Sequence, residues 1–402
     1  MSNSPEIHGS GLRGMSRLAF DGIAGLIGMV ETMHGNIAGH SGLARRAEGK
    51  TRGITRLVYR SIRGVTHLTG IAVDAALGLL DPILTVEHPT PSREARRAVL
   101  NGVLGDHLAE TSNPLAIPMR LRRHGRPLRL ERDSLAEALT PLSGRLVVLL
   151  HGLCLDDRDW HRDGHDHGAA LARDLGYTPL YLHYNTGLHI SVNGRAFADL
   201  LQTLVAEWPL PLKELIVIGH SMGGLVSRSA CYYGASKGHD WLRHLRKLIF
   251  LGTPHHGAPM ERGGQWLHLA LDKSRYTAAF THLGRIRSAG ITDLRYGNLL
   301  DGDWQDRDRF KHVGDTRQAV PLPEGVQCFA IAASTGSRAS GLRDRLLGDG
   351  LVPVGSALGQ HEEPPRALSI PESRQWIGRT MTHFDLLSRQ NVYEQITLWL
   401  GS

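Results

Sequence analysis

The segment LIVIGHSMGG, residues 215–224, decides the predicted fold of this chain. Its first residues are all apolar, as in a strand that is buried on both faces, and a helix-like run over 225–233 follows it. Ser221 therefore stands in a Gly-x-Ser-x-Gly pattern between a strand and a helix. The glycines on both sides permit a tight turn that raises a serine hydroxyl above the end of a sheet. We predict that Ser221 is a catalytic nucleophile.

Further short apolar runs lie on both sides of this segment, and helix-length segments separate most of them. These runs are residues 146–150, 178–183, 248–251 and 327–332. Alternating strands and helices predict a doubly wound α/β architecture with a mostly parallel sheet. A helix over 92–109 and a β-hairpin around 124–126 precede these strands, and an amphipathic helix over 386–400 follows them.

The N-terminal region, residues 1–91, has a different pattern. Apolar residues at helical spacing predict a helical hairpin within 15–86, with its turn at 35–53. Over 52–80 an arginine stripe lies opposite an apolar stripe, as in a helix that rests on an anionic lipid surface. Packing against the rest of the protein would need the same apolar stripe. Peripheral membrane or lipid-surface contact and internal packing therefore both stay open.

We divide the chain into this helical region and a catalytic domain over residues 92–402. Within that domain, residues 257–324 form a connection between two predicted strands that is too long for a simple helical crossover. Apolar residues in its middle have helical spacing, which predicts a cap over the cleft that excludes water and selects apolar acyl chains. Plain packing on the core is the alternative.

Composition excludes several classes of function. The net charge of +7 comes largely from arginines scattered among acidic residues, so we expect no nucleic-acid partner. The cysteines have no metal-type or Cys-x-x-Cys spacing and are expected to be buried thiols in a reducing compartment. They are Cys154, Cys231 and Cys328.

No apolar stretch approaches the ~20 residues of a membrane span, and no signal-peptide pattern stands at the start. The expected location is cytoplasmic, with lipid-surface association as an open addition, and the oligomeric state stays undetermined.

A serine hydroxyl needs a base to remove its proton and an acid to orient that base. The chain order that accompanies this turn is serine, acid, histidine. Asp349, in a turn after the strand 327–332, and His383, in a short loop before the last helix, fit this order. The competing acids are Asp293, Asp301 and Asp303.

The tetrahedral intermediate of such a reaction needs two N–H groups that bind its oxyanion. We expect these groups to be the backbone N–H of Leu153, after the strand 146–150, and that of Met222. The candidates for lining the substrate cleft are His151, His255 and His256. Structural hydrogen bonding is the alternative for His255 and His256. The segment HRDGHDHG, residues 161–168, lacks the spacing of an open zinc site, so we expect no metal.

Several segments together resemble a known family. They are VVLLHGL at 147–153, GHSMGG at 219–224, LGTPHHGAP at 251–259, GDGLVP at 348–353 and THFDLLS at 382–388. In this order they resemble the lipase and esterase branch of the α/β-hydrolase superfamily, and in particular bacterial esterase/lipase proteins similar to the hydrolase part of GPI inositol-deacylases. The resemblance covers roughly residues 115–400.

This resemblance implies an α/β-hydrolase fold with Ser221 as nucleophile, Asp349 as acid and His383 as base. It also implies an oxyanion hole at Leu153 and Met222. The expected activity is hydrolysis of a small-molecule or lipid carboxylic ester, with neither cofactor nor metal. An acyltransferase or thioesterase with the same triad is one alternative. A lipid- or polymer-surface interaction protein with an inactive hydrolase fold is another.

Overall fold

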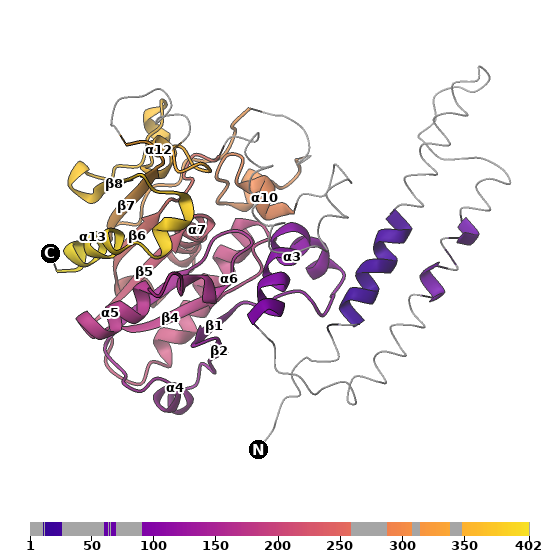
Figure 1. The fold of residues 1–402 in the computed structure, drawn as a ribbon, viewed down its shortest axis with the longest axis horizontal. Coiled ribbons are helices and arrows are strands. Elements are labelled where there is room, and N and C mark those ends of the chain that lie inside the picture. Colours follow the sequence, from indigo (N-terminus) through magenta and orange to yellow (C-terminus); the bar gives the residue numbers. More distant parts are fainter. Residues whose placement is uncertain are drawn as a thin grey trace. The chain divides into compact units, whose positions relative to one another are not determined.

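The computed structural model of this chain describes residues 11, 13–25, 60–62, 64, 66–69, 91–258, 288–307, 314–337 and 348–401. The chain divides into two compact units. The first consists of Met1–Pro91 with Leu108–Ala116, and the second of Ser92–His107 with Ile117–Ser402. Figure 1 shows the elements of both units.

In the first unit, residues 13–25 and 66–69 are helical. Within this unit the side-chain amide of Asn113 donates a hydrogen bond to the carbonyl oxygen of Gly14 at 3.1 Å. The predicted turn at 35–53 and most of the predicted arginine-striped helix lie outside the described residues. The N-terminal hairpin therefore stays a prediction.

The second unit is built on an eight-stranded sheet with the order β2-β1-β4-β3-β5-β6-β7-β8. Its strands are β1 Arg120–Arg123, β2 Arg126–Pro127, β3 Arg145–Leu150, β4 Thr178–His183, β5 Glu214–His220, β6 Leu245–Leu251, β7 Gln327–Ser334 and β8 Gln375–Arg379. Strands β3 to β8 pair with one another in parallel, whereas β1 is antiparallel to both β2 and β4. The carboxyl ends of the parallel strands therefore meet at one edge of the sheet.

The described helices connect these strands. The α-helices are α3 Pro91–Glu110, α4 Arg132–Ala138, α5 His167–Leu175, α6 Ile190–Ala206, α7 Met222–Lys237, α10 Ala289–Asp293, α12 Val354–Ala357 and α13 Gln390–Leu400. The 3-10 helices are η1 Asp157–Trp160, η2 Asp240–Arg243, η4 Asp301–Asp303, η5 Pro364–Arg366, η6 Glu372–Arg374 and η7 His383–Leu387. None of the described helices combines the length and the apolar character that crossing a membrane requires.

Alternate residues of the parallel strands pack on opposite faces of the sheet, because the side-chain period of a strand is two. Val147, Ile216 and Ile249 face a cluster that includes side chains of α5 and α13. On the other face α6 lies along α7 (Figure 1). A Cβ atom added at Gly223 of α7 would stand 2.8 Å from Leu150 Cβ, so α7 packs closely on that face.

These elements confirm the predicted doubly wound α/β sheet. All five predicted buried runs fall within β3 to β7. Two details differ from the prediction. Strand β8 was not predicted, and α13 begins at Gln390 rather than at residue 386. The second difference arises because the side chains of Thr382 and Asp385 form a capping box that closes residues 383–387 into the separate turn η7.

Candidate active site

Ser221 is the single residue between the end of β5 and the start of α7. Its backbone has φ 54° and ψ −123°, a conformation that a non-glycine residue adopts only under strain. Two hydrogen bonds hold it there, from Ser221 N to Leu251 O at 2.8 Å and from Gly224 N to Ser221 O at 3.1 Å. The strand and the helix therefore force the serine into the turn that a nucleophile elbow requires.

The glycines of the elbow are needed because the backbone is crowded there. A Cβ atom at Gly219 would stand 2.5 Å from the backbone nitrogen of Gly224. At Gly223 it would stand 2.5 Å from the carbonyl oxygen of Leu150. Real Cβ atoms do not approach backbone atoms this closely, so α7 can begin directly behind Ser221 only with glycine at both positions.

His383 and Asp349 form a buried pair at the same edge of the sheet. His383 Nδ1 lies 2.6 Å from Asp349 Oδ2, and each side chain is 1% exposed. Asp349 Oδ1 accepts hydrogen bonds from the backbone N–H groups of Leu351 at 2.9 Å and Val352 at 2.8 Å. The Nδ1–H group of His383 donates its hydrogen bond to Asp349 Oδ2. The acceptor lone pair of the imidazole is then at Nε2.

Two contacts bring His383 to the elbow. His220 Nε2 donates to the carbonyl oxygen of His383 at 3.1 Å. The centroids of the two imidazole rings are 4.7 Å apart. Gly252 has φ 60°, and a Cβ atom there would stand 3.0 Å from His383 Cε1. Gly252 directly follows Leu251, whose carbonyl oxygen accepts from Ser221 N, so the same segment contacts both Ser221 and His383.

The loop after β3 approaches Ser221 from the other side. A Cβ atom at Gly152 would stand 3.0 Å from Ser221 Cβ and 3.5 Å from Ser221 Oγ. Leu153 follows in this loop, and Met222 is the first residue of α7. Within the part of the chain that the structure describes, neither of their N–H groups donates a hydrogen bond. Both predicted oxyanion donors thus belong to segments that flank Ser221.

Comparison with protein families agrees with this arrangement. Residues 141–315, less than half of the chain, match the model of the PGAP1-like alpha/beta domain. The matched segment contains Ser221 and the loop after β3, and it ends before Asp349 and His383. The mostly parallel eight-stranded sheet with its helices is consistent with an α/β-hydrolase fold.

Several solved structures are similar to this chain. The mature lipase BlEst2 of Bacillus licheniformis is 17% identical, with 70% of this chain and 97% of that chain covered and a TM-score of 0.41. A thermophilic esterase from Thermogutta terrifontis is 14% identical, with coverage of 71% and 93% and a TM-score of 0.38. The Pyrococcus furiosus esterase Pf2001 is 14% identical, with coverage of 64% and 79% and a TM-score of 0.38. A comparison with curated proteins finds no match.

His151 is fully buried at the carboxyl end of β3. Its Nδ1 donates to the carbonyl oxygen of Gly152 at 3.0 Å, and its ring stacks on Tyr184 at 4.5 Å. Burial lowers the pKa of His151 to about 4, so the ring is neutral at neutral pH. The ring of His151 is thus hydrogen-bonded to its own loop, and the backbone carbonyl oxygen of His151 accepts from the Tyr184 hydroxyl at 2.7 Å.

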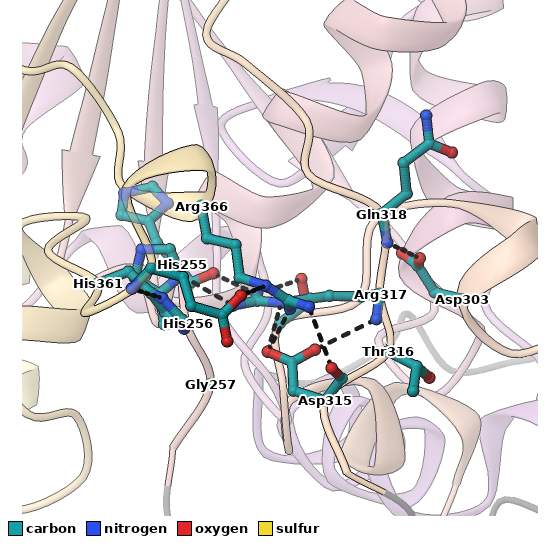
Figure 2. A network of polar contacts seen from close by, with 12 residues as sticks. His255, His256, Gly257, Asp303, Asp315, Thr316, Arg317, Gln318, His361 and Arg366 are labelled. Carbon is teal, nitrogen blue, oxygen red and sulfur yellow. Dashed lines mark hydrogen bonds and ion pairs between the residues drawn. The ribbon is translucent and has the colours of Figure 1, made fainter.

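His255 and His256 belong to a polar network around Arg317 (Figure 2). Arg317 donates to the carbonyl oxygen of His255 at 2.7 Å and to His256 Nδ1 at 2.8 Å. Asp315 binds both Arg317, at 3.1 Å, and Arg366, at 2.7 Å. Burial lowers the pKa of His256 to about 4 and that of His255 well below its ordinary value. His255 thus takes part in this network through its backbone carbonyl oxygen and His256 through its ring, and their contact with a substrate stays a prediction.

Arg317, Asp315 and Arg366 were not identified from the sequence. Arg317 lies 61 residues beyond His256, in a stretch without periodicity or motif. No local pattern could have indicated this contact.

The three competing acids have other partners in the structure. Asp293 accepts from His189 Nδ1 at 3.0 Å and from the backbone of Ile190 at 2.9 Å. Asp301 pairs with Arg195, and Asp303 accepts from backbone N–H groups of its own loop. Each of these carboxylates therefore supports local structure.

The histidine-rich segment 161–168 is held by hydrogen bonds. His165 Nε2 donates to His167 Nδ1 at 2.9 Å, and His167 Nε2 donates to the carbonyl oxygen of Leu386 at 3.0 Å. Burial lowers the pKa of His167 to about 4. Among the described residues, no group of three or more His, Cys, Asp or Glu side chains could hold a metal ion.

Proposed function

We propose that this chain is a carboxylic ester hydrolase that works through a Ser221–His383–Asp349 triad. The observation that carries the proposal is the buried 2.6 Å contact between His383 Nδ1 and Asp349 Oδ2, beside a serine held in a strained elbow. A contact of this kind orients an imidazole so that Nε2 can act as a base. Strain in the elbow is the feature expected of a nucleophile rather than of a structural serine.

The reaction is a two-step acyl transfer. His383 Nε2 takes the Ser221 hydroxyl proton while Oγ attacks the ester carbonyl, and the resulting oxyanion is bound by the N–H groups of Leu153 and Met222. The protonated His383 then gives its proton to the leaving alcohol. Water attacks the acyl-enzyme, with His383 acting again as base, and releases the acid. Asp349 stabilises the imidazolium in both steps. This chemistry needs neither metal nor cofactor.

The proposed substrate is a small-molecule or lipid ester with an apolar acyl part, such as an acylglycerol or a short polyester. A cap formed by residues 257–324 would select it. Residues 259–287 and 308–313 of this segment lie outside the described residues. In support, the backbone N–H of Gly290, in α10, donates to the carbonyl oxygen of Gly187 at 3.0 Å, just beyond the carboxyl end of β4. Part of the proposed cap is thereby anchored at the catalytic edge of the sheet.

We also propose that the N-terminal region, residues 1–91, adds peripheral contact with a lipid surface to a cytoplasmic enzyme. The support is the arginine stripe opposite an apolar stripe in the sequence over 52–80. Residues 92–402 would then be the catalytic domain.

A fluorophosphonate probe tests the central proposal, because it reacts with an activated serine. The wild-type chain should be labelled at Ser221, as mapped by mass spectrometry, and should hydrolyse aryl esters. Ser221→Ala should lose labelling and nearly all turnover, on the order of 10⁴–10⁶-fold. The matched control is Ser236→Ala, an exposed serine on the same helix, which should leave both unchanged.

A wild-type chain that is neither labelled nor active would refute the proposal and favour an interaction protein with an inactive fold. Labelling with little hydrolysis would favour an acyltransferase or thioesterase. A product assay with an added alcohol acceptor and with thioester substrates separates these two from the hydrolase.

A further inference from the structure

The direction of the Leu153 N–H depends on what holds the carbonyl group of Gly152. These two groups belong to one planar trans peptide and point in opposite directions. The Gly152 carbonyl oxygen accepts from His151 Nδ1 at 3.0 Å and from Leu155 N at 3.3 Å. The His151 ring is therefore one of the two groups that set the direction of the proposed oxyanion donor.

Tyr184 holds His151 in two ways. Its side chain is 1% exposed, and its hydroxyl donates to the carbonyl oxygen of His151 at 2.7 Å. Its ring also stacks on the imidazole, with the centroids 4.5 Å apart and the planes inclined by 26°. The backbone and the ring of His151 are thus both fixed by one side chain from beyond the end of β4.

Thr186 holds the other end of the same short loop. Its Oγ1 accepts from the backbone N–H of Cys154 at 3.2 Å. Cys154 has φ 61°, so this residue stands in a conformation that needs support from its surroundings. The residues on both sides of the Gly152–Leu153 peptide are therefore bound by Tyr184 and Thr186.

The segment that carries these two side chains is itself anchored on two helices. The side-chain amide of Asn185 donates to the carbonyl oxygen of Gly105 in α3 at 2.8 Å. The side-chain amide of Asn193 in α6 donates to the carbonyl oxygen of Asn185 at 2.9 Å. A support anchored in this way can transmit its geometry to the loop that it holds.

We propose that Tyr184, together with Thr186, is a positioning residue for the oxyanion hole, acting through the loop His151–Cys154. This inference rests on the proposed function. Tyr184 directs a hydrogen-bond donor that matters most when the carbonyl oxygen becomes negatively charged. Loss of the tyrosine hydroxyl should therefore slow turnover more than it weakens ground-state binding.

The chain offers a matched control at the opposite end of β4. Tyr177 directly precedes β4, whereas Tyr184 directly follows it. Tyr177 is 3% exposed, and its hydroxyl donates to Glu214 at 3.0 Å and accepts from Arg145 at 2.8 Å. Tyr177→Phe thus removes a largely buried hydroxyl at the end of β4 away from Ser221.

The experiment measures kcat and KM on an aryl ester for the full chain and its variants. It also measures the affinity of an alkyl boronic acid, which forms a tetrahedral adduct with an active serine. Tyr184→Phe should lower kcat about 10- to 100-fold, weaken boronic acid binding similarly and change KM by less than about threefold. Tyr177→Phe should leave all three values near those of the wild type. Thr186→Val should resemble Tyr184→Phe, and Thr186→Ser should restore the wild-type values.

Each contrary result has a separate meaning. If the wild-type chain hydrolyses the ester and Tyr184→Phe matches Tyr177→Phe, the positioning role is wrong and the proposed function stands. If Tyr184→Phe does not fold, the Thr186 variants decide, and equal kcat values for Thr186→Val and Thr186→Ser overturn the inference. If the wild-type chain neither hydrolyses the ester nor is labelled at Ser221, the proposed function and this inference both fail.

Discussion

Asp349 Oδ2 lies 2.6 Å from His383 Nδ1, although the two residues are 34 positions apart in the chain. The contact is buried, and the other carboxylate oxygen is occupied by two backbone N–H groups. Removing the negative charge of Asp349 would leave the imidazole without the group that selects its tautomer and balances its charge.

Asp349→Asn should therefore lower kcat by about 10³- to 10⁴-fold while the chain stays folded. Asp301→Asn is the matched control, because Asp301, in η4, is bound by Ser191 and Arg195 of α6. We expect it to change kcat by less than about threefold. Steady-state kinetics on an aryl ester, with circular dichroism of each variant, provides the check. If Asp301→Asn loses most of its kcat while Asp349→Asn keeps it, the proposed acid is the wrong residue.

Gly152→Ala should impair catalysis, because the added methyl group would crowd Ser221. The added methyl would stand 3.0 Å from Ser221 Cβ and 3.1 Å from His220 Nδ1, so the loop or the serine has to shift. We expect kcat to fall at least about tenfold, since small displacements of reacting groups are costly. Gly302→Ala is the control, because a Cβ there meets no atom within 4 Å. Equal kcat values for the two variants would contradict the close approach of this loop.

Asp156 should make stability depend on pH. Burial, followed by repulsion from Asp159 and Asp157, raises the pKa of Asp156 from 3.8 to about 7. Between pH 4 and 7 the folded state keeps a proton that the unfolded state releases, so the free energy of unfolding falls as pH rises through this window. Asp156→Asn removes the ionisable group, so this fall in the free energy of unfolding should disappear. The asparagine side chain can still accept the hydrogen bond from Arg158 N.

We therefore expect Asp156→Asn to exceed the wild type in unfolding free energy by on the order of 1–4 kcal/mol at pH 8, and by much less at pH 5. Urea unfolding followed by tryptophan fluorescence measures both values. Asp133→Asn, which changes an exposed carboxylate on α4, should show no such trend. A constant difference between pH 5 and pH 8 would contradict the raised pKa.

Chelators should leave esterase activity unchanged. The polar contacts of His165 and His167 are hydrogen bonds within the protein, and the proposed reaction uses no metal. The His161→Ala, His165→Ala double variant should likewise stay active. Activity assays after dialysis against EDTA test this expectation. Inhibition that added Zn²⁺ or Ca²⁺ reverses would refute the metal-free mechanism.

The N-terminal arginine stripe should bind anionic lipid. Full-length protein should sediment with vesicles containing phosphatidylserine at low salt and be released at high salt, because exposed charges are screened. Replacing Arg52, Arg56, Arg60 and Arg63 by Gln should abolish this binding without changing hydrolysis of water-soluble esters. If the wild-type protein does not bind at low salt, the hairpin serves internal packing instead.

The sequence alone determined the elements whose signals are local. Five buried strands were predicted, because uninterrupted apolar runs between helix-length segments leave few alternatives. Ser221 was predicted as the nucleophile because the glycines on both sides of it permit a tight turn between a strand and a helix. Strand β8, residues 375–379, was not predicted, because its sequence is short and mixes polar with apolar residues. Only its pairing with β7 identifies it as a strand.

The tertiary structure alone decided which distant groups meet. His383 and Asp349 were selected by chain order, but their contact distance depends on how β7, β8 and η7 pack. Tyr184 carries no sequence signal, since its role exists only where the end of β4 lies beside the end of β3. Local propensities act over a few residues, whereas a site assembled at the edge of a parallel sheet depends on strand order and on close packing between segments far apart in the chain.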